Sequence, residues 1–216
     1  FIDAGFKEGD TVRFDYRNAE GDVPTARSLA QKFVADKVDA IITIGTPASQ
    51  AALAATQDTR TIPVFFSAVA DPYGAGLAGK KEGDTVTPDP ASHPDNVTGV
   101  QAFPPVEAGM KLIQEVLPQA KTVGLLWNPS EPNSLATTLE ARKVAGNLNL
   151  IVVEEPVAKP ADSAAAAASF ANKNIDAFFV STTNSVVAGL DAVVAEARRT
   201  KKPLFGNDPL SAARGA

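Results

Sequence analysis

Short runs of β-branched and aromatic residues alternate with alanine-rich amphipathic stretches along almost the whole chain. The runs predict strands, and the amphipathic stretches predict helices. The run Ala-Ile-Ile-Thr-Ile at residues 40–44 has no polar alternation, which is typical of a parallel strand covered on both faces. Residues 11–16 alternate apolar and polar side chains, so they predict an edge or half-covered strand. Repeated strand–helix units favour parallel sheets joined by right-handed crossovers.

The predicted elements follow one another with little interruption. The expected strands are residues 11–16, 40–44, 62–66, 96–101, 122–127, 148–153, 175–180 and 203–206. The expected helices are residues 24–38, 47–57, 106–117, 133–147, 161–172 and 185–200.

Residues 67–96 break this rhythm, because they are rich in glycine and proline and show no sustained periodicity. We predict a long surface loop there. The break divides the alternation into two sets of similar size, which favours two doubly wound lobes, residues 1–100 and 101–216, over a single sheet. Both ends look unfinished: residues 1–6 have the pattern of a last helical turn, and the chain ends soon after the final strand. We therefore expect that a first strand and a closing C-terminal segment are absent.

Composition narrows the function classes. The chain has 216 residues, of which 44% are hydrophobic and 21% charged, as is usual for soluble globular proteins. Its net charge of −5 and its lack of a basic cluster give nucleic-acid binding little support. The absence of cysteine excludes disulfides, thiolate catalysis and cysteine-based zinc sites. No apolar run approaches the roughly 18 residues of a membrane span, so we expect no membrane insertion by this segment.

The motifs of catalysis and cofactor binding are weak. Residues 74–79 match G-x-G-x-x-G, but a phosphate cradle needs a strand directly before the glycines and a helix directly after them. Neither is predicted there. His93 has no second histidine or cysteine to share a metal, and Ser130 and Ser181 have no general-base partner. We therefore expect no enzyme activity, no metal and no cofactor.

Small hydrogen-bonding residues gather where four predicted strands end, which is where open α/β sheets bind ligands. The four loops are residues 44–50, 67–72, 127–134 and 181–185. Serine, threonine, asparagine and aspartate are also the usual residues of helix caps and turns, so any one loop has this simpler explanation. Two such loops in each lobe favour a small-molecule site in a cleft between the lobes.

The same loops carry a family resemblance that runs through nearly the whole chain in order. The chain resembles the extracytoplasmic substrate-binding proteins of ABC transporters, in the subfamily that includes tryptophan- and tyrosine-type amino-acid binders. The matching stretches are DYRNAEGD (15–22), AQKFVADKVDAIITIGTPASQAA (30–52), PVFFSAVADPYGAGL (63–77), NVTGV (96–100), KTVGLLWNPSEPNS (121–134), FFVSTTNSVV (178–187) and PLFGNDPLSAARGA (203–216).

The resemblance implies a type I periplasmic-binding fold, in which two Rossmann-like, doubly wound parallel-sheet lobes close on a ligand about a hinge. Residues 96–101 would form the first hinge strand. The ligand-binding residues that it implies are Thr46, Ser49, Gln50, Ala68 and Asp71 in the first lobe, and Asn133, Ser134, Thr182, Thr183, Asn184 and Asp208 in the second.

The implied function is that of a periplasmic or extracytoplasmic protein, lipid-anchored through residues upstream of Phe1, which passes a small polar or amphipathic ligand to an ABC permease. An aromatic amino acid is one such ligand. Thr183 stands where the family pattern has an aspartate, so Asp208 or Asp71 would have to balance the charge of an ammonium group. Two other hypotheses are the ligand-sensing domain of a regulator or receptor, and an enzyme on a doubly wound scaffold such as a nucleotide-dependent transferase.

Overall fold

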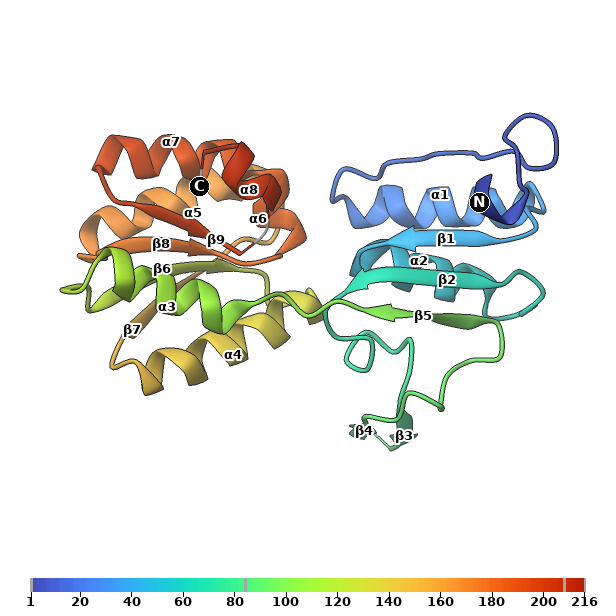
Figure 1. Cartoon of the computed structure of the whole chain (residues 1–216), viewed down its shortest axis with the longest axis horizontal. Helices are drawn as coiled ribbons and strands as arrows, with labels where there is room; N and C mark the ends of the chain where they lie inside the picture. Colours follow the sequence, from blue (N-terminus) through green and yellow to red (C-terminus); the bar gives the residue numbers. More distant parts are fainter. Residues whose placement is uncertain (1, 84, 208, 216) are drawn as a thin grey trace.

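The computed structural model describes residues 2–83, 85–207 and 209–215 (Figure 1). These residues form two α/β bodies that lie side by side and are joined where the chain leaves β5 (Val97–Gln101) and enters α3 (Val106–Val116). We call the part from η1 (Ile2–Ala4) to β5 the first lobe, and the part from α3 to α8 (Pro209–Ala213) the second lobe. Each lobe has its own parallel sheet, which confirms the predicted fold class. The predicted boundary after residue 100 falls inside β5 and stays a prediction.

The first lobe is built on a three-stranded parallel sheet in the order β1-β2-β5. The sheet joins β1 (Ile41–Ile44) to β2 (Val64–Val69), with Ile41 opposite Val64, and β2 to β5. The helices are α1 (Val23–Ala35) and α2 (Thr46–Thr56). The core of this lobe is a cluster around Val64, Leu77 and Val97.

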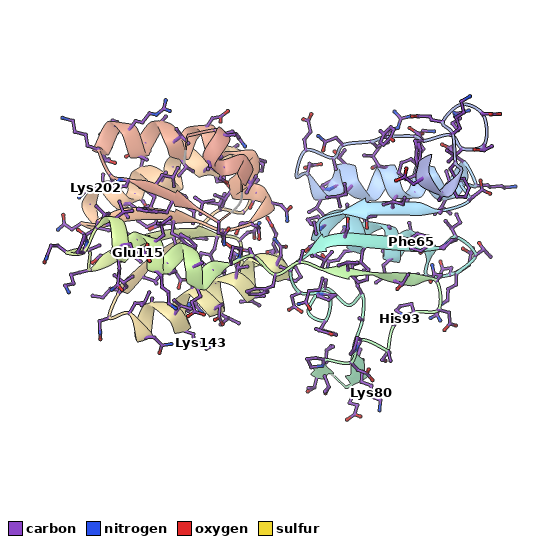
Figure 2. The ribbon with its side chains drawn as sticks, viewed as in Figure 1. Phe65, Lys80, His93, Glu115, Lys143 and Lys202 are labelled. Atoms are coloured by element: carbon purple, nitrogen blue, oxygen red, sulfur yellow. The ribbon has the colours of Figure 1, made fainter. Side chains whose placement is uncertain are left out.

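One face of this sheet is uncovered. Ile42 is 53% exposed, Ile44 77% and Phe65 43%, and Figure 2 shows Phe65 on β2. The prediction that residues 40–44 are covered on both faces was wrong. The physical reason is that α2 packs on β1 and β2 while α1 packs against α2, so both helices add to the same apolar cluster on one side.

Two other predictions for the first lobe were also wrong. Residues 11–16 form no strand beyond an isolated bridge between Glu8 and Val12, because no described strand runs beside them to complete a ladder. The region 67–96, predicted as a loop, contains the antiparallel hairpin of β3 (Lys80–Glu82) and β4 (Thr85–Thr87). This hairpin projects away from the rest of the lobe (Figure 1), and Figure 2 labels Lys80, the first residue of β3.

The second lobe has a four-stranded parallel sheet in the order β7-β6-β8-β9, with helices on both faces. One apolar cluster joins β6 and β8 to α3 and α4, and the other joins the opposite face to α5, α6 and α7. The strands are β6 (Thr122–Trp127), β7 (Ile151–Pro156), β8 (Ala177–Val180) and β9 (Leu204–Gly206). The remaining elements are α4 (Pro132–Asn147), η2 (Pro160–Asp162), α5 (Ser163–Ser169), η3 (Phe170–Asn172), α6 (Asn184–Ala188) and α7 (Leu190–Thr200).

Two predicted features of this lobe need correction. The single helix expected over residues 185–200 is divided at Gly189 into α6 and α7. A β-carbon on Gly189 would lie 2.6 Å from the carbonyl oxygen of Pro160, so only glycine allows this close approach to η2. The last strand was expected to have no helix after it, but the short helix α8 follows β9.

Candidate functional site: facing strand ends of two lobes

The first wall of the candidate site begins where β1 turns into α2. Gly45 has a φ of 90°, a conformation that favours glycine, and its N–H donates to the carbonyl of Ser67 at 2.9 Å. Thr46 starts the helix and is 1% exposed, yet its Oγ1 has no hydrogen-bond partner within the described residues. The N-cap residue of α2 is Gly45, so no N-cap side chain bonds to the first N–H groups of this helix. A buried hydroxyl and the free N–H groups of a helix start therefore meet at one place.

Two other predicted residues of this helix are used inside the lobe. The Ser49 hydroxyl donates to the carbonyl of Gly45 at 2.7 Å and pairs with the Thr43 hydroxyl at 2.8 Å. The Gln50 amide donates to the carbonyl of Ala75 at 3.2 Å. These bonds fix the turn from β1 to α2 and attach α2 to the loop that follows β2.

The end of β2 is irregular. The register with β5 shifts between Phe66 and Val69, and Ala68 there has a left-handed φ of 53°. Further on, the carboxylate of Asp71 accepts the backbone N–H groups of Tyr73 at 3.1 Å and Gly74 at 2.9 Å. Asp71 thus already holds its own turn, which is a structural role for a predicted ligand contact.

The second wall lies where β6 and β8 end. The side-chain amide of Asn133 donates to the carbonyl of Thr182 at 2.7 Å, while its buried Oδ1 has no partner within the described residues. The Ser134 hydroxyl accepts from the backbone N–H of Asn128 and from the Thr183 hydroxyl, both at 2.8 Å. The structure therefore brings Asn133, Ser134, Thr182 and Thr183 together, and their contact with a ligand stays a prediction.

Sequence reasoning missed the centre of this wall, the carboxylate of Glu131. Glu131 is only 7% exposed and comes just before α4. Its sequence neighbours resemble an ordinary helix start, and its main partners are more than fifty positions away, so no local signal reveals it. Its hydrogen-bond donors are the backbone N–H of Asn184 (2.7 Å), the Asn184 amide (2.9 Å), the backbone N–H of Ser185 (3.0 Å), the Asn128 amide (3.1 Å) and the Asn133 amide (3.4 Å).

The two walls touch at Asn184. A β-carbon on Gly45 would lie 3.7 Å from Asn184 Oδ1, and one on Gly21 would lie 3.5 Å from the Asn184 carbonyl oxygen and 3.3 Å from Ala188 Cβ. The N-terminus of α2 in the first lobe therefore faces the start of α6 in the second lobe. The predicted residue Asp208 lies outside the described residues.

Two cavities of the described structure lie elsewhere. One, of about 170 Å³, lies in the first lobe and includes Tyr73, His93 and Gln101 in its lining. The other, of about 420 Å³, lies in the second lobe and includes Glu155 and Asp162. No predicted site residue among those described lines either of them. The polar groups at the strand ends therefore define the candidate site better than these hollows, which lack such a convergence.

Metal chemistry finds no support in the described part of the chain, where no cluster of three or more histidine, aspartate or glutamate residues could hold an ion. His93 is exposed and lies beside the Pro94 carbonyl, 3.1 Å from its Nδ1 (Figure 2). What the strand ends offer is a set of hydroxyl, amide and backbone groups on two facing walls, held in place by the carboxylates of Asp71 and Glu131 and suited to holding a small polar molecule.

A family comparison decides the class of protein. Residues 1–216 match the family described as ABC transporter substrate binding protein. The chain belongs to this family. The family resemblance predicted from the sequence is thereby confirmed.

Relatives of this substrate-binding family support the same assignment. A tyrosine-binding protein of Clostridioides difficile (strain R20291) is 35% identical over 214 residues, which are 99% of this chain and 58% of that protein. The chain therefore spans less than two thirds of the length of this curated relative. No helix in the described ranges is both long and apolar enough to cross a membrane.

Two solved structures of similar sequence identity differ in how well they superpose. An ABC domain in complex with L-Trp from Streptococcus pneumonia is 29% identical, with a TM-score of 0.87 over 100% of this chain and 68% of that chain. A ligand-free, open substrate-binding protein with adhesive properties from Clostridium difficile is 34% identical, with a TM-score of 0.55 over 95% of this chain and 65% of that chain. The arrangement of the whole chain, both lobes included, is therefore closer to that of the L-Trp complex than to that of the ligand-free, open structure.

Proposed function

We propose that this chain is the ligand-binding part of an ABC importer's solute-binding protein, and that it holds an aromatic amino acid between its two lobes. Family membership gives the class of protein. The choice of ligand is supported by the two relatives, one named for tyrosine and one solved with L-Trp. In this proposal the ligand is bound and released unchanged, as the family of binding proteins suggests.

The observation that carries this proposal is a pair of unsatisfied buried atoms, one on each wall. Thr46 Oγ1 and Asn133 Oδ1 are buried and have no partner within the described residues. Leaving such a group unpaired costs about 1–3 kcal/mol, so a ligand that pairs with both is favoured. Both residues lie in the first turn of a long helix without a side-chain cap, α2 and α4. The N-terminus of α2 favours an anionic group and the Thr46 hydroxyl can donate, so we assign the ligand carboxylate to them. Asn133 Oδ1 can only accept, so we assign it an N–H donor of the ligand.

The ammonium group of the ligand needs a negative partner. Thr183 is neutral and donates to Ser134, and Asp71 already accepts two backbone N–H groups. Asp208, which follows β9 in the sequence, therefore remains our proposal for this role. The other predicted contacts, Ser49, Gln50 and Ala68, act by shaping the first wall.

Binding works through closure of the lobes. A ligand that contacts both walls binds the closed arrangement more tightly than the open one and so shifts the population toward it. We propose that a permease recognises this closed state and that the protein acts outside the cytoplasm. A nucleotide-dependent enzyme and the sensor domain of a regulator are the rival functions.

Calorimetry tests the proposal directly. We expect L-Trp, L-Tyr or L-Phe to bind the purified protein, and L-Ala and ATP to release no heat. Replacing Thr46 by valine keeps the shape of the side chain but removes the hydroxyl, so it should weaken binding about tenfold.

The matched control for Thr46→Val is Thr56→Val, at the opposite end of the same helix. Thr56 is also buried, but its hydroxyl bonds inside the lobe, to the carbonyl of Ala52 at 2.9 Å. Thr56→Val should lower stability and leave affinity unchanged. Binding of ATP, or equal loss of affinity in both variants, would contradict the proposed site.

A further inference from the structure

The buried carboxylate at the centre of the second wall has no cationic partner among the described residues. Glu131 is 7% exposed, and within the described residues it forms hydrogen bonds but no ion pair. All of its donors are neutral backbone or amide groups. It does not cap its own helix α4. Burying a charge in this way is costly unless it is well hydrogen-bonded, so the bonds made by Glu131 must hold the surrounding groups firmly.

The charge of Glu131 decides how the Asn184 amide is oriented. An ionised carboxylate only accepts hydrogen bonds, so the amide must turn its Nδ2 toward Glu131, 2.9 Å away. The backbone N–H of Asn184 donates to the same carboxylate oxygen at 2.7 Å, which fixes the main chain as well. The Oδ1 of Asn184 is then left to point the other way.

That oxygen faces the first lobe. Asn184 Oδ1 lies 3.7 Å from where a β-carbon on Gly45 would stand, directly before the uncapped N-terminus of α2. The first N–H groups of a helix are unpaired donors and carry a partial positive charge, so an acceptor placed beside them is attracted. If the amide were reversed, its NH₂ would meet these donors and repel them.

We propose that Glu131 is a positioning residue that fixes Asn184 with its oxygen toward α2, so that the pair acts as a latch favouring the closed arrangement of the lobes. The latch rests on the lobe closure of the proposed function, but not on the identity of the ligand. It acts at the lobe contact and needs no bond from Glu131 to the ligand.

Distance measurements between spin labels test the latch without any ligand. The chain has no cysteine, so labels can be placed on Gln31→Cys in α1 and Ala195→Cys in α7, both exposed. Asn184→Ala removes the oxygen and leaves Glu131 in place. We expect the ratio of the long-distance to the short-distance population to rise about five- to tenfold, as for the loss of one polar attraction between the lobes.

Glu131→Gln tests the orientation itself. A glutamine side chain has one oxygen and one NH₂ group. In either orientation its NH₂ group therefore faces N–H groups that donated to the carboxylate in the wild type. We expect the same shift toward long distances as in Asn184→Ala, and no further shift in the double variant, because both changes break one latch. Glu131→Asp, which keeps the charge, should recover part of the short-distance population.

The matched control is Glu196→Gln, which also neutralises a buried carboxylate of the second lobe. Glu196 is 9% exposed and bonds to Arg199 within α7. The Glu196→Gln substitution should lower the melting temperature without changing the distances between the spin labels. Distances that are unchanged in Asn184→Ala and Glu131→Gln, or shifted equally in Glu196→Gln, would overturn the latch. Failure of the proposed function looks different: aromatic amino acids would leave the wild-type distances unchanged, while the two latch variants would still shift them.

Discussion

The two parallel sheets of this protein are covered differently. In the second lobe, the central strands β6 and β8 are buried along almost their whole length, with separate apolar clusters on the two faces. In the first lobe, β1 alternates between buried and exposed residues, and Ile44 is 77% exposed. Parallel sheets usually have both faces covered, so the first lobe is the unusual one.

Similar sequence patterns therefore do not give equal burial in the two sheets. The exposed side chains of the first sheet, Ile42, Ile44 and Phe65, contribute little to stability because water reaches them in the folded state. The second lobe therefore has the larger reserve of apolar stabilisation. We expect the first lobe to open at lower free energy, with the second lobe serving as the firmer wall of the site.

The largest effect should come from truncating a phenylalanine in the second sheet. Phe179 on β8 is fully buried, and a β-carbon on Gly109 of α3 would lie only 2.9 Å from its ring. Phe179→Ala should cost about 3–5 kcal/mol. Urea unfolding followed by the single tryptophan, Trp127 at the end of β6, measures this loss in the second lobe.

The matched variant is Phe65→Ala on β2, where the side chain is 43% exposed. We expect this variant to lose about 1 kcal/mol of stability or less. Its unfolding is measured by circular dichroism, because the single tryptophan lies in the other lobe and does not report on β2. Equal costs for the two variants would mean that the uncovered face is not open in solution.

A valine and an isoleucine at corresponding strand ends differ in burial between the two lobes. Val180 ends β8 and is fully buried, whereas Ile44 ends β1 and is 77% exposed. Val180→Thr buries a hydroxyl and should cost about 1–2 kcal/mol. Ile44→Thr should change stability by less than about 0.5 kcal/mol. Chemical denaturation of both variants measures the difference, and a large loss in Ile44→Thr would contradict it.

The predictable part of the fold is the part that local pattern determines. The run at residues 122–127 is bounded by Lys121 and Asn128, and β6 spans those residues as predicted. The exposure of Ile42 and Ile44 was not predictable, because a wholly apolar run says nothing about how many helices will pack on it. The hairpin of β3 and β4 was missed because its three-residue strands are too short to show alternation.

The candidate site was also predictable only in part. Polar residues after β6 and β8 were identifiable, because strand ends and turn residues are local features. Glu131 was not, because its role depends on Asn184 and Ser185, which tertiary folding brings to it from far along the chain. The unpaired states of Thr46 Oγ1 and Asn133 Oδ1 are also properties of packing, so only the structure reveals them.

Acid should reduce the difference in stability between the two lobes, because it weakens a carboxylate interaction in the second lobe. Hydrogen bonds from the backbone N–H groups of Lys121 and Thr122 lower the pKa of Asp176 below its usual 3.8. Since the folded pKa is the lower one, this stabilisation is complete above about pH 4 and is lost as the pH falls through the folded pKa. Asp176→Asn should cost about 1 kcal/mol at pH 7, because it replaces a charged acceptor by a neutral one.

Thermal unfolding at pH 7 and pH 3 tests this expectation. The stability of Asp176→Asn should differ from that of the wild type at pH 7, and the difference should be smaller at pH 3, because the wild type loses its carboxylate stabilisation as the pH falls below about 4. Asp176→Ala has no acceptor and should remain less stable at both pH values. If Asp176→Asn lowered the melting temperature by the same amount at both pH values, the charge-based explanation would be contradicted. In the first lobe the pKa of Asp22 is also lowered, by hydrogen bonds from Thr25, but this helix cap is exposed and should matter less.

The smallest effect should come from the strained end of β2. Ala68 has a left-handed φ of 53°, which costs an L-residue about 1–2 kcal/mol, whereas glycine adopts it freely. Glycine also makes the unfolded chain more flexible, and this reduces the gain from relieving the strain by about 0.4–1 kcal/mol. Ala68→Gly should therefore stabilise the first lobe by about 0.5 kcal/mol. Ala70→Gly, at a buried position without positive φ, should instead destabilise it. Opposite shifts of the denaturation midpoint in these two variants would show that the first wall stores strain at the turn where β2 ends.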